Sequence, residues 1–383
     1  MDVDGSHPQS DPHRVGVRPQ EYAPWVTAWA DALYGPAGFY RRPEGPAGHF
    51  RTASHAAPGP LARAVARLAR HAGCSRVVDV GAGRGELLVA LAALEDAADA
   101  PPLGLHGCDV VPRPAALPGP VGWSAGVPAL LDDLPLLDDA LVVGWELLDV
   151  VPCPVVEVDG AGAVREVLVD PATGHERLGG PPGADDAAWL ARWWPLAGLP
   201  PGTRAEVGRP RDALWSQLTA RCAATPHGAV LLAVDYAHTA TARPPAGSLA
   251  GYRGGLLVDP VPDGSCDVTA HVALDAVAAA AGSAGGTAGV VVRQRDALRA
   301  LGLSAGPGAH PVSHDPTGAP LPAATILRAL AERSALAELL DPDGLGGFSW
   351  LLSAAGRPQP VLPGLPGLPE PPGLPEPPGP RPV

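Results

Sequence analysis

The sequence predicts an α/β fold with a Rossmann-like sheet, in which mostly parallel strands carry helices on both faces. Helix-like and strand-like segments alternate between residues 61 and 151, and β-branched runs predict strands at 76–80, 104–109 and 140–145. The first of these strands runs directly into a glycine-rich turn and an Ala/Leu-rich helix, an arrangement typical of a ligand-binding strand–turn–helix unit. A fourth apolar run, 229–235, predicts one more buried strand.

Length and composition limit the classes of protein to consider. With 383 residues, 46% of them hydrophobic, the chain can form one large domain or two ordinary ones with a true core. Its net charge of −13 argues against a nucleic-acid partner, because basic side chains hold such partners. The five cysteines form no C-x-x-C pair, and the sequence shows neither a signal peptide nor an apolar run long enough for a membrane span. We therefore expect a cytoplasmic protein with reduced cysteines.

The N-terminal part precedes the predicted sheet. Residues 1–20 are expected to be disordered. Residues 21–34 predict a helix that carries Trp25 and Trp29 on one face, where they pack on the core. Residues 35–60 are rich in glycine and proline and predict a long, lid-like loop, so that residues 21–60 form a helix and lid ahead of the main domain.

The main domain is expected over residues 61–355, with an insertion at about 155–210. The insertion is expected to form an antiparallel ribbon, with strands near 155–158 and 164–169, followed by a helix around 185–194. Such an insertion is suited to covering a large substrate. After it come helices at 211–224, 271–281 and 294–301 and a final apolar element at 345–352, with Asp267 or Thr269 as cap of a helix that begins near His271. Residues 356–383 are proline-rich and predict a disordered, polyproline-like tail.

The glycine-rich turn predicts a nucleotide site. Asp79 ends the first strand, and glycines follow at alternate positions, 81, 83 and 85. Position 86 is a glutamate, so the dinucleotide pattern G-x-G-x-x-G is incomplete. An acid at position 79 suits a ligand with a cationic amino group, such as S-adenosylmethionine, and Asp109 at the end of the next strand can accept hydrogen bonds from ribose hydroxyls. The competing interpretation is a turn without a ligand, since 48 residues are glycine.

A second cluster of acids follows the strand at 140–145. Glu146 and Asp149 lie at the carboxyl edge of the predicted sheet, where open α/β folds bind ligands. Either the two carboxylates share one face and act on a substrate, or one caps a helix and the other lies on the surface. The pair Asp235 and Tyr236 ends a later strand in the same way. No set of residues has the spacing of a metal site or of a nucleophile with its base.

Taken in order, these clusters resemble the MidA family of class I S-adenosylmethionine-dependent methyltransferases. Mitochondrial members of that family methylate a protein arginine during assembly of respiratory complex I. The resemblance runs from about residue 20 to 352. It rests on Tyr40 with Gly48-His49-Phe50-Arg51-Thr52, the turn 79–85, Trp145-Glu146-Leu147-Leu148-Asp149-Val150-Val151-Pro152, Glu206-Val207, Asp235-Tyr236, Leu249-Ala250-Gly251-Tyr252, Asp267-Val268-Thr269-Ala270-His271-Val272 and Gly346-Gly347-Phe348.

The resemblance implies a class I methyltransferase sheet, S-adenosylmethionine as cofactor and methyl transfer to a nitrogen of a protein substrate, an arginine side chain. It also implies roles for individual residues. The cofactor residues would be Asp79, Gly81, Gly83, Gly85 and Asp109. Glu146 and Asp149 would be catalytic, orienting the acceptor and offsetting its charge, while Glu206, Asp235 and Tyr236 would bind the substrate.

The sequence departs from the family pattern at three informative places. His49 stands where the family has an aspartate, His55 where it has a glutamate, and Trp145 where it has an asparagine. These changes leave two alternatives to an arginine methyltransferase. One is a non-catalytic S-adenosylmethionine-binding assembly protein, and the other is a methyltransferase for small molecules.

Overall fold

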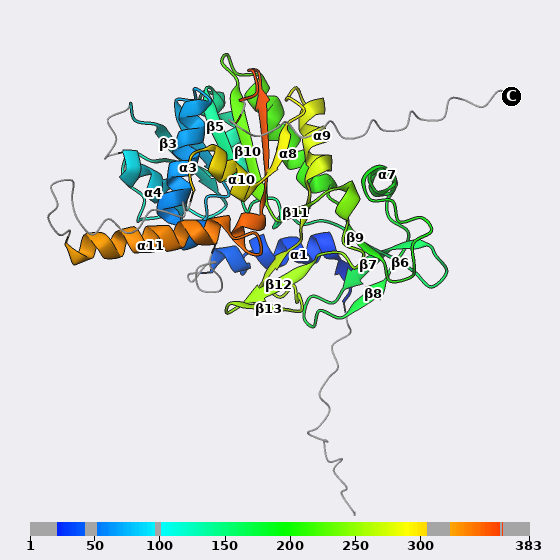
Figure 1. Cartoon of the computed structure of the whole chain (residues 1–383). Helices are drawn as coiled ribbons and strands as arrows, with labels where there is room; N and C mark the ends of the chain where they lie inside the picture. The colour runs from blue at the N-terminus through cyan, green and yellow to red at the C-terminus, as the bar shows by residue number, and fades with distance from the viewer. Residues whose placement is uncertain (1–20, 43–51, 96–100, 305–321, 361, 363–383) are drawn as a thin grey trace, which may run out of the picture.

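The computed structural model describes residues 21–42, 52–95, 101–304, 322–360 and 362. A seven-stranded central sheet organises the molecule, with strand order β16-β17-β10-β5-β2-β3-β4 (Figure 1). In chain order its strands are β2 (Arg76–Val80), β3 (Gly104–Asp109), β4 (Gly122–Ala125), β5 (Ala140–Trp145), β10 (Ala229–Asp235), β16 (Val290–Arg293) and β17 (Ser349–Ala355). The expectations at 76–80, 104–109, 140–145 and 229–235 are confirmed, whereas β4 was not predicted.

The central sheet is mostly parallel. The strands β4, β3, β2, β5 and β10 pair in parallel with their neighbours. The exception is β17, which lies antiparallel between β10 and β16 and accounts for the second half of the apolar element expected at 345–352. Because parallel strands end at the same edge, the residues after β2, β3, β5 and β10 are brought together there.

Helices cover both faces of this sheet, as expected. Along β10, Val230 and Leu232 point into one hydrophobic core and Leu231 and Ala233 into the other. The first core is covered by α3 (Pro58–His71), α4 (Glu86–Glu95), α10 (Gln294–Ala300) and the end of α11 (Ala323–Leu340). The second is covered by α5 (Val127–Asp132), α6 (Leu134–Leu137), α8 (Arg209–Ala223) and α9 (Leu274–Ser283).

A second, antiparallel sheet contains the predicted ribbon. The strands β6 (Val155–Val158) and β7 (Val164–Val169) pair as expected, and β1 (Ala23–Pro24), β8 (Glu176–Leu178) and β9 (Arg204–Glu206) extend the sheet. The helix α7 (Ala184–Trp193) packs on it. The predicted N-terminal helix is α1 (Trp25–Tyr34), and Trp25 and Trp29 are buried against this sheet, as expected.

A third, small sheet was not predicted. Its strands are β12 (Ala250–Arg253), β13 (Leu256–Val258) and β14 (Asp267–Thr269), and in Figure 1 β12 and β13 lie below the central sheet, beside α1. The expectation that Asp267 or Thr269 caps a helix is therefore wrong, because both residues belong to β14. The short strand β15 (Val272–Ala273), paired with β11 (Ala237–His238), follows, and α9 begins only at Leu274.

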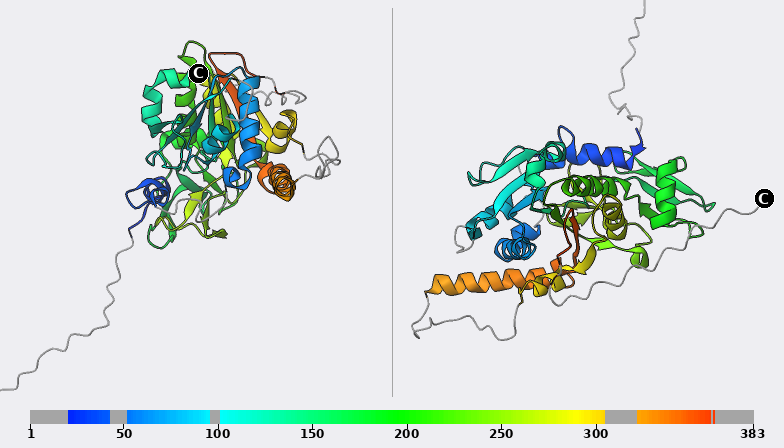
Figure 2. Two further views of the ribbon diagram at one scale, coloured as in Figure 1. Left: turned by 90° about the vertical axis from the view of Figure 1, so that its left-hand side faces the viewer. Right: turned by 90° about the horizontal axis from the view of Figure 1, so that it is seen from above.

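Several other segments differ from expectation. The predicted loop at 35–60 contains the 3₁₀ turn η1 (Phe39–Arg41), the short helix α2 (Ala53–Ala56) and the start of α3. The long helix α11 was not predicted and extends beyond the sheet (Figure 2). Two short 3₁₀ turns, η3 (Ala240–Ala242) and η4 (Leu345–Gly347), complete the elements.

Some expectations fall outside the described residues: those for residues 1–20, for His49 and for most of the proline-rich tail. Within the described ranges, no helix is long and apolar enough to cross a membrane. In the same ranges, no three His, Cys, Asp or Glu side chains are grouped so that they could hold a metal ion.

Candidate active site

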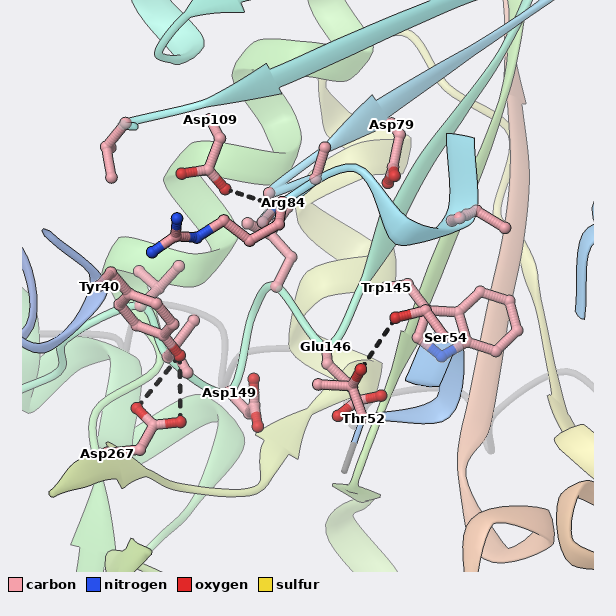
Figure 3. A pocket seen from close by; sticks show the side chains of 18 of the residues that line it. Tyr40, Thr52, Ser54, Asp79, Arg84, Asp109, Trp145, Glu146, Asp149 and Asp267 are labelled. Carbon is pink, nitrogen blue, oxygen red and sulfur yellow. Dashed lines mark hydrogen bonds between the residues drawn. The ribbon is translucent and has the colours of Figure 1, made fainter. Parts of the chain in front are cut away.

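A cavity of about 450 Å³ lies at the carboxyl edge of the central sheet. Residues that follow β2, β3, β5 and β10 line one part of it, and residues from α2, the segment after α1 and the third sheet line the rest. Figure 3 shows Asp79 and Asp109 on one side and Tyr40, Asp149, Glu146 and Asp267 on the other. We call these two sides the glycine-loop end and the acceptor end.

The glycine-loop end is a tight turn that needs glycine. Gly81, Gly83 and Gly85 have φ of +76°, +57° and +79°, which side chains with a Cβ rarely adopt. A Cβ on Gly81 would lie 2.8 Å from Leu147 Cδ1, and a Cβ on Gly85 would lie 2.5 Å from Leu117 Cδ2. The turn therefore needs glycine at 81 and 85 for its packing. Gly81 and Gly83 line the cavity, whereas Gly85 lies outside its lining.

Two acids flank this turn. The Asp109 carboxylate accepts hydrogen bonds from the backbone N–H of Gly83 (2.9 Å) and of Val111 (3.1 Å), so it ties the glycine loop to the end of β3. Burial raises the pKa of Asp109 above its usual range. Asp79 is 3% exposed, and burial together with the nearby Asp109 and Glu86 carboxyls raises its pKa to about 7.

Glu146 is held in a strained backbone conformation directly after β5. Its φ is +51°, which costs a residue other than glycine about 1–3 kcal/mol. Its N–H donates to the carbonyl of Val234 (2.8 Å), and its Oε1 accepts from the N–H of Ala53 (3.0 Å) in α2. Burial raises the pKa of the Glu146 carboxyl to about 8. The side chain lines the cavity.

Asp149 lies beside Glu146 in the cavity wall. It is 6% exposed, and its Oδ1 has no hydrogen-bond partner within the part of the chain that the structure describes. Its backbone carbonyl accepts from Arg211 Nη2 (3.0 Å). Burial raises the pKa of Asp149 to about 6, and the Arg211 guanidinium partly opposes this. A buried carboxyl with an unused oxygen favours a ligand that donates hydrogen bonds.

Sequence reasoning missed a third acid at the acceptor end. Asp267, in β14, lines the cavity and is 1% exposed. The Tyr40 hydroxyl lies 3.1 Å from each of its carboxylate oxygens and donates to them. Burial, and then the Asp149 carboxylate, hold the pKa of Asp267 well above its usual range. The signal in the sequence was the family-like segment at 267–272, which was interpreted as a helix cap.

The three predicted substrate-binding residues have different positions. Tyr236 lines the cavity, stacked against His271 with ring centroids 5.6 Å apart. Asp235 lies behind the wall, where its Oδ2 accepts from the N–H of Leu148 (2.9 Å), and burial followed by the Asp149 charge raises its pKa well above the usual range. It supports the turn that carries Asp149.

The structure does not bring Glu206 to the cavity. Its Oε1 accepts from the backbone N–H of Ser248 (2.9 Å) and of Leu249 (3.2 Å), and its Oε2 accepts from the Ser248 hydroxyl (3.1 Å). These bonds hold the loop that leads into β12. None of the lining residues comes from the 155–210 insertion, so the expected cover over the acceptor is supplied by the third sheet instead.

The cavity is strongly acidic. Six carboxyl groups line it: those of Asp79, Glu86, Asp109, Glu146, Asp149 and Asp267. Among the described lining residues, the basic side chains are Arg84 and His55; Arg84 Nη2 donates to the carbonyl of Arg42 (2.8 Å), and His55 pairs with Glu86 at 3.3 Å. So much buried acid favours cationic ligands at both ends of the cavity, because a positive charge would allow these carboxyls to ionise.

Comparison with known proteins shows one matching family. Residues 109–291 match the profile of a family described as "Putative S-adenosyl-L-methionine-dependent methyltransferase". None of the curated proteins matches the chain. The family match confirms the resemblance, the enzyme class and the cofactor, S-adenosylmethionine, that the sequence led us to expect.

Two solved structures are similar to this one. The first is a "likely methyl transferase" from Burkholderia thailandensis bound to S-adenosyl-homocysteine, with 23% identity, a TM-score of 0.65 and 88% of each chain covered. The second is the native structure of an uncharacterized protein of the same superfamily and organism, with 23% identity, a TM-score of 0.64 and 88% of each chain covered. At this identity the likeness shows the fold.

The residues at the glycine-loop end fit S-adenosylmethionine. The positive φ angles give a tight turn in which Gly81 and Gly83 line the cavity, so a ligand can approach their backbone. The acids on either side of the turn suit the cationic amino group and the ribose hydroxyls of the cofactor.

Proposed function

We propose that this S-adenosylmethionine-dependent methyltransferase acts on a side-chain nitrogen of a protein substrate, an arginine guanidinium. The observation that carries the proposal is the acidic acceptor end, where Glu146, Asp149 and Asp267 line one wall. A guanidinium keeps its positive charge at any physiological pH and offers several N–H donors, so paired carboxylates are its natural partners.

The proposal assigns the cofactor to the glycine-loop end. There, Asp79 binds the amino group and Asp109 the ribose hydroxyls, with Gly81, Gly83 and Gly85 allowing close approach of the backbone. Both oxygens of Asp109 already accept backbone N–H groups, but each retains a lone pair for a further hydrogen bond. The similar structure from Burkholderia thailandensis is bound to S-adenosyl-homocysteine, which supports cofactor binding by this chain.

When bound, S-adenosylmethionine supplies a methyl group already activated by its sulfonium charge. The protein has two further tasks. Asp149 and Glu146 orient the guanidinium and offset positive charge at the acceptor nitrogen. Glu146 Oε2 takes the proton that this nitrogen loses, because a carboxyl with a pKa of about 8 is a competent base near neutral pH.

Tyr236 and Asp235 have supporting roles in this proposal. Tyr236, 39% exposed in the cavity wall, contacts the substrate, and Asp235 fixes the turn that carries Asp149. The hydrogen bonds of Glu206 favour a structural role over substrate binding.

The remaining parts of the proposal concern fold and location. In the central sheet of the described residues, β17 is antiparallel to its neighbours and lies one strand inside the edge strand β16. This topology supports a Rossmann-like class I methyltransferase domain over residues 61–355. The five cysteines are all free and buried, which supports a cytoplasmic location. The net charge of −13 supports a protein partner over a nucleic acid.

Calorimetric titration with S-adenosylmethionine, followed by transfer of a radiolabelled methyl group, tests the proposal. We expect binding at micromolar strength and transfer to peptides with a single arginine, but not to matched peptides with a single lysine. Proton release on binding, measured in two buffers of different ionisation enthalpy, is expected because a cation ionises the raised carboxyls. Absence of cofactor binding would refute the enzyme, and transfer to lysine alone would refute the acceptor.

A further inference from the structure

One row of side chains crosses the third sheet from its outer edge into the cavity. Tyr252 on β12 is paired directly with Leu257 on β13 and with Asp267 on β14. Residues directly opposite each other in antiparallel strands point to the same face of the sheet. Leu257, Tyr252 and Asp267 therefore form a continuous row on one face, and Tyr252 and Asp267 both line the cavity.

The row changes in character along its length. Asp267 is 1% exposed and Tyr252 is half-buried, and both line the cavity, whereas Leu257 is 69% exposed and lies outside the lining. Among the exposed large apolar side chains of the described residues, Leu257 has the highest exposed fraction. Full burial of a leucine stabilises a complex by about 1.5–3 kcal/mol, so an uncovered leucine beside the cavity is well placed to bind an apolar group.

The opposite face of the same hairpin has a different role. Val268 is paired with Gly251, which is paired with Val258, and this line faces the core around Trp29. Leu256 follows on that face, opposite Arg253, and is 68% exposed. Two neighbouring leucines are therefore equally exposed, but only Leu257 shares a face with the cavity-lining residues.

We propose that the row Leu257–Tyr252–Asp267 binds a substrate polypeptide whose methylated residue is followed or preceded, two or three positions away, by an apolar side chain. The spacing follows from geometry, because two strand separations of about 4.8 Å span about 10 Å, or roughly three residues of an extended peptide. The occupant is a polypeptide because Leu257 lies outside the cavity, where a small acceptor that fills the cavity would not reach. This inference rests on the proposed function and adds the sequence context of the substrate.

Two pools of peptides, each with one central arginine, test this preference for a nearby apolar side chain. In one pool the positions two and three residues to either side of it are leucine, and in the other they are serine. With radiolabelled S-adenosylmethionine, we expect kcat/KM for the leucine pool to be about 10-fold higher, as burial of one apolar side chain provides. The Leu257→Ser variant should reduce this preference to within about 2-fold.

The matched control is Leu256→Ser, which removes an equally exposed leucine from the other face and should leave the preference unchanged. Equal use of the two pools by the wild type, equal effects of the two substitutions, or no methylation of either pool by protein that binds S-adenosylmethionine would overturn the inference. Sedimentation provides a further test, since a dimer that Leu257→Ser dissociates would assign the row to a second copy of the chain. Loss of cofactor binding in the wild type would instead refute the proposed function itself.

Discussion

The two ends of the cavity are built in different ways. The glycine-loop end comes from one stretch of chain, residues 79–109, in which two adjacent parallel strands end side by side. The acceptor end joins residues from three distant parts of the chain: Tyr40 in the N-terminal segment, Glu146 and Asp149 after β5, and Tyr252 and Asp267 in the third sheet. The glycine-loop end is thus a local unit, whereas the acceptor end depends on how the N-terminal segment and the third sheet pack against the central sheet.

The two ends also differ in how their acids are satisfied. Both oxygens of Asp109 accept backbone N–H groups, and this carboxylate stabilises the loop even without a ligand. Asp149 is buried with an oxygen that has no partner among the described residues, and Glu146 sits at a positive φ. Strain and unsatisfied polar groups accumulate where function requires them, so the acceptor end should be the less stable and the more sensitive of the two.

The largest effect should come from Glu146→Gln. Glutamine has nearly the same shape and can keep the hydrogen bond from Ala53, but it cannot accept the proton or offset charge. We expect kcat to fall about 10²–10³-fold while the affinity for S-adenosylmethionine changes little. Single-turnover methyl transfer and calorimetry measure the two quantities separately. Equal losses in kcat and in the affinity for S-adenosylmethionine would mean that Glu146 binds the cofactor. The two ends of the cavity would then not have separate roles.

The pH dependence sharpens this prediction. With a pKa of about 8, Glu146 is protonated and inactive as a base at lower pH, so kcat/KM should rise with pH up to about 8 and then level. The Glu146→Gln variant should not show this rise in kcat/KM.

The raised pKa of Glu146 also affects stability. The folded protein holds a proton that the unfolded chain releases near pH 4.5, so the stability that this group contributes falls between pH 4.5 and about 8. Thermal unfolding at pH 5 and pH 9 should show a smaller decrease in the variant.

The next effect concerns the glycine-loop end. Gly81→Val forces a β-branched residue into a positive φ and places its Cβ against Leu147. A valine costs about 1–3 kcal/mol in this conformation, so we expect the turn to relax out of it. The affinity for S-adenosylmethionine should then fall about 10–100-fold, because binding must restore the strained turn. Gly160→Val is the control, because its φ is not positive and no atom lies within 4 Å of its Cβ. Wild-type affinity in Gly81→Val would show that the turn is not the cofactor site.

A smaller effect is expected from Tyr40→Phe. Loss of the hydroxyl removes a donor from the buried Asp267 and costs about 1–3 kcal/mol at that position. The KM for an arginine peptide should rise about 10-fold, whereas cofactor affinity should stay within about 2-fold. An unchanged KM would show that the hydrogen bond between Tyr40 and Asp267 does not contribute to substrate binding. Tyr22→Phe, outside the cavity lining, is a suitable control.

The smallest effect should follow from His55→Ala. The pair between His55 and Glu86 is 3.3 Å long, and both side chains are 26% exposed, so it contributes at most about 1 kcal/mol. Urea unfolding should show a loss of this size. A large loss of activity would mean that this departure from the family pattern acts on the site and not only on the contact between α2 and the glycine loop.

Much of the fold could be predicted because the sequence patterns that specify it are local. The strands β2, β3, β5 and β10, the ribbon of β6 and β7 and the burial of Trp25 and Trp29 follow from periodicity and turn residues within a few positions. The third sheet was missed because its strands, such as β13 (Leu256–Val258), are three or four residues long and stabilised by pairing between distant segments. Another of these short strands, β14, begins at Asp267, and its shortness made Asp267 resemble a helix cap.

By itself, the sequence determined the glycine-loop end of the cavity. A β-branched run, an acid and alternate glycines specify a strand–turn–helix unit, and parallel pairing then brings Asp79 and Asp109 to one edge. Only the tertiary structure decided the acceptor end. Tyr40 and Asp267 are 227 residues apart in the chain, and no local pattern encodes their hydrogen bond. Likewise, Glu206 has the residue type of a ligand-binding acid, but packing used all of its acceptors for a loop. The chemical identity of a side chain is local, whereas its partners depend on long-range packing.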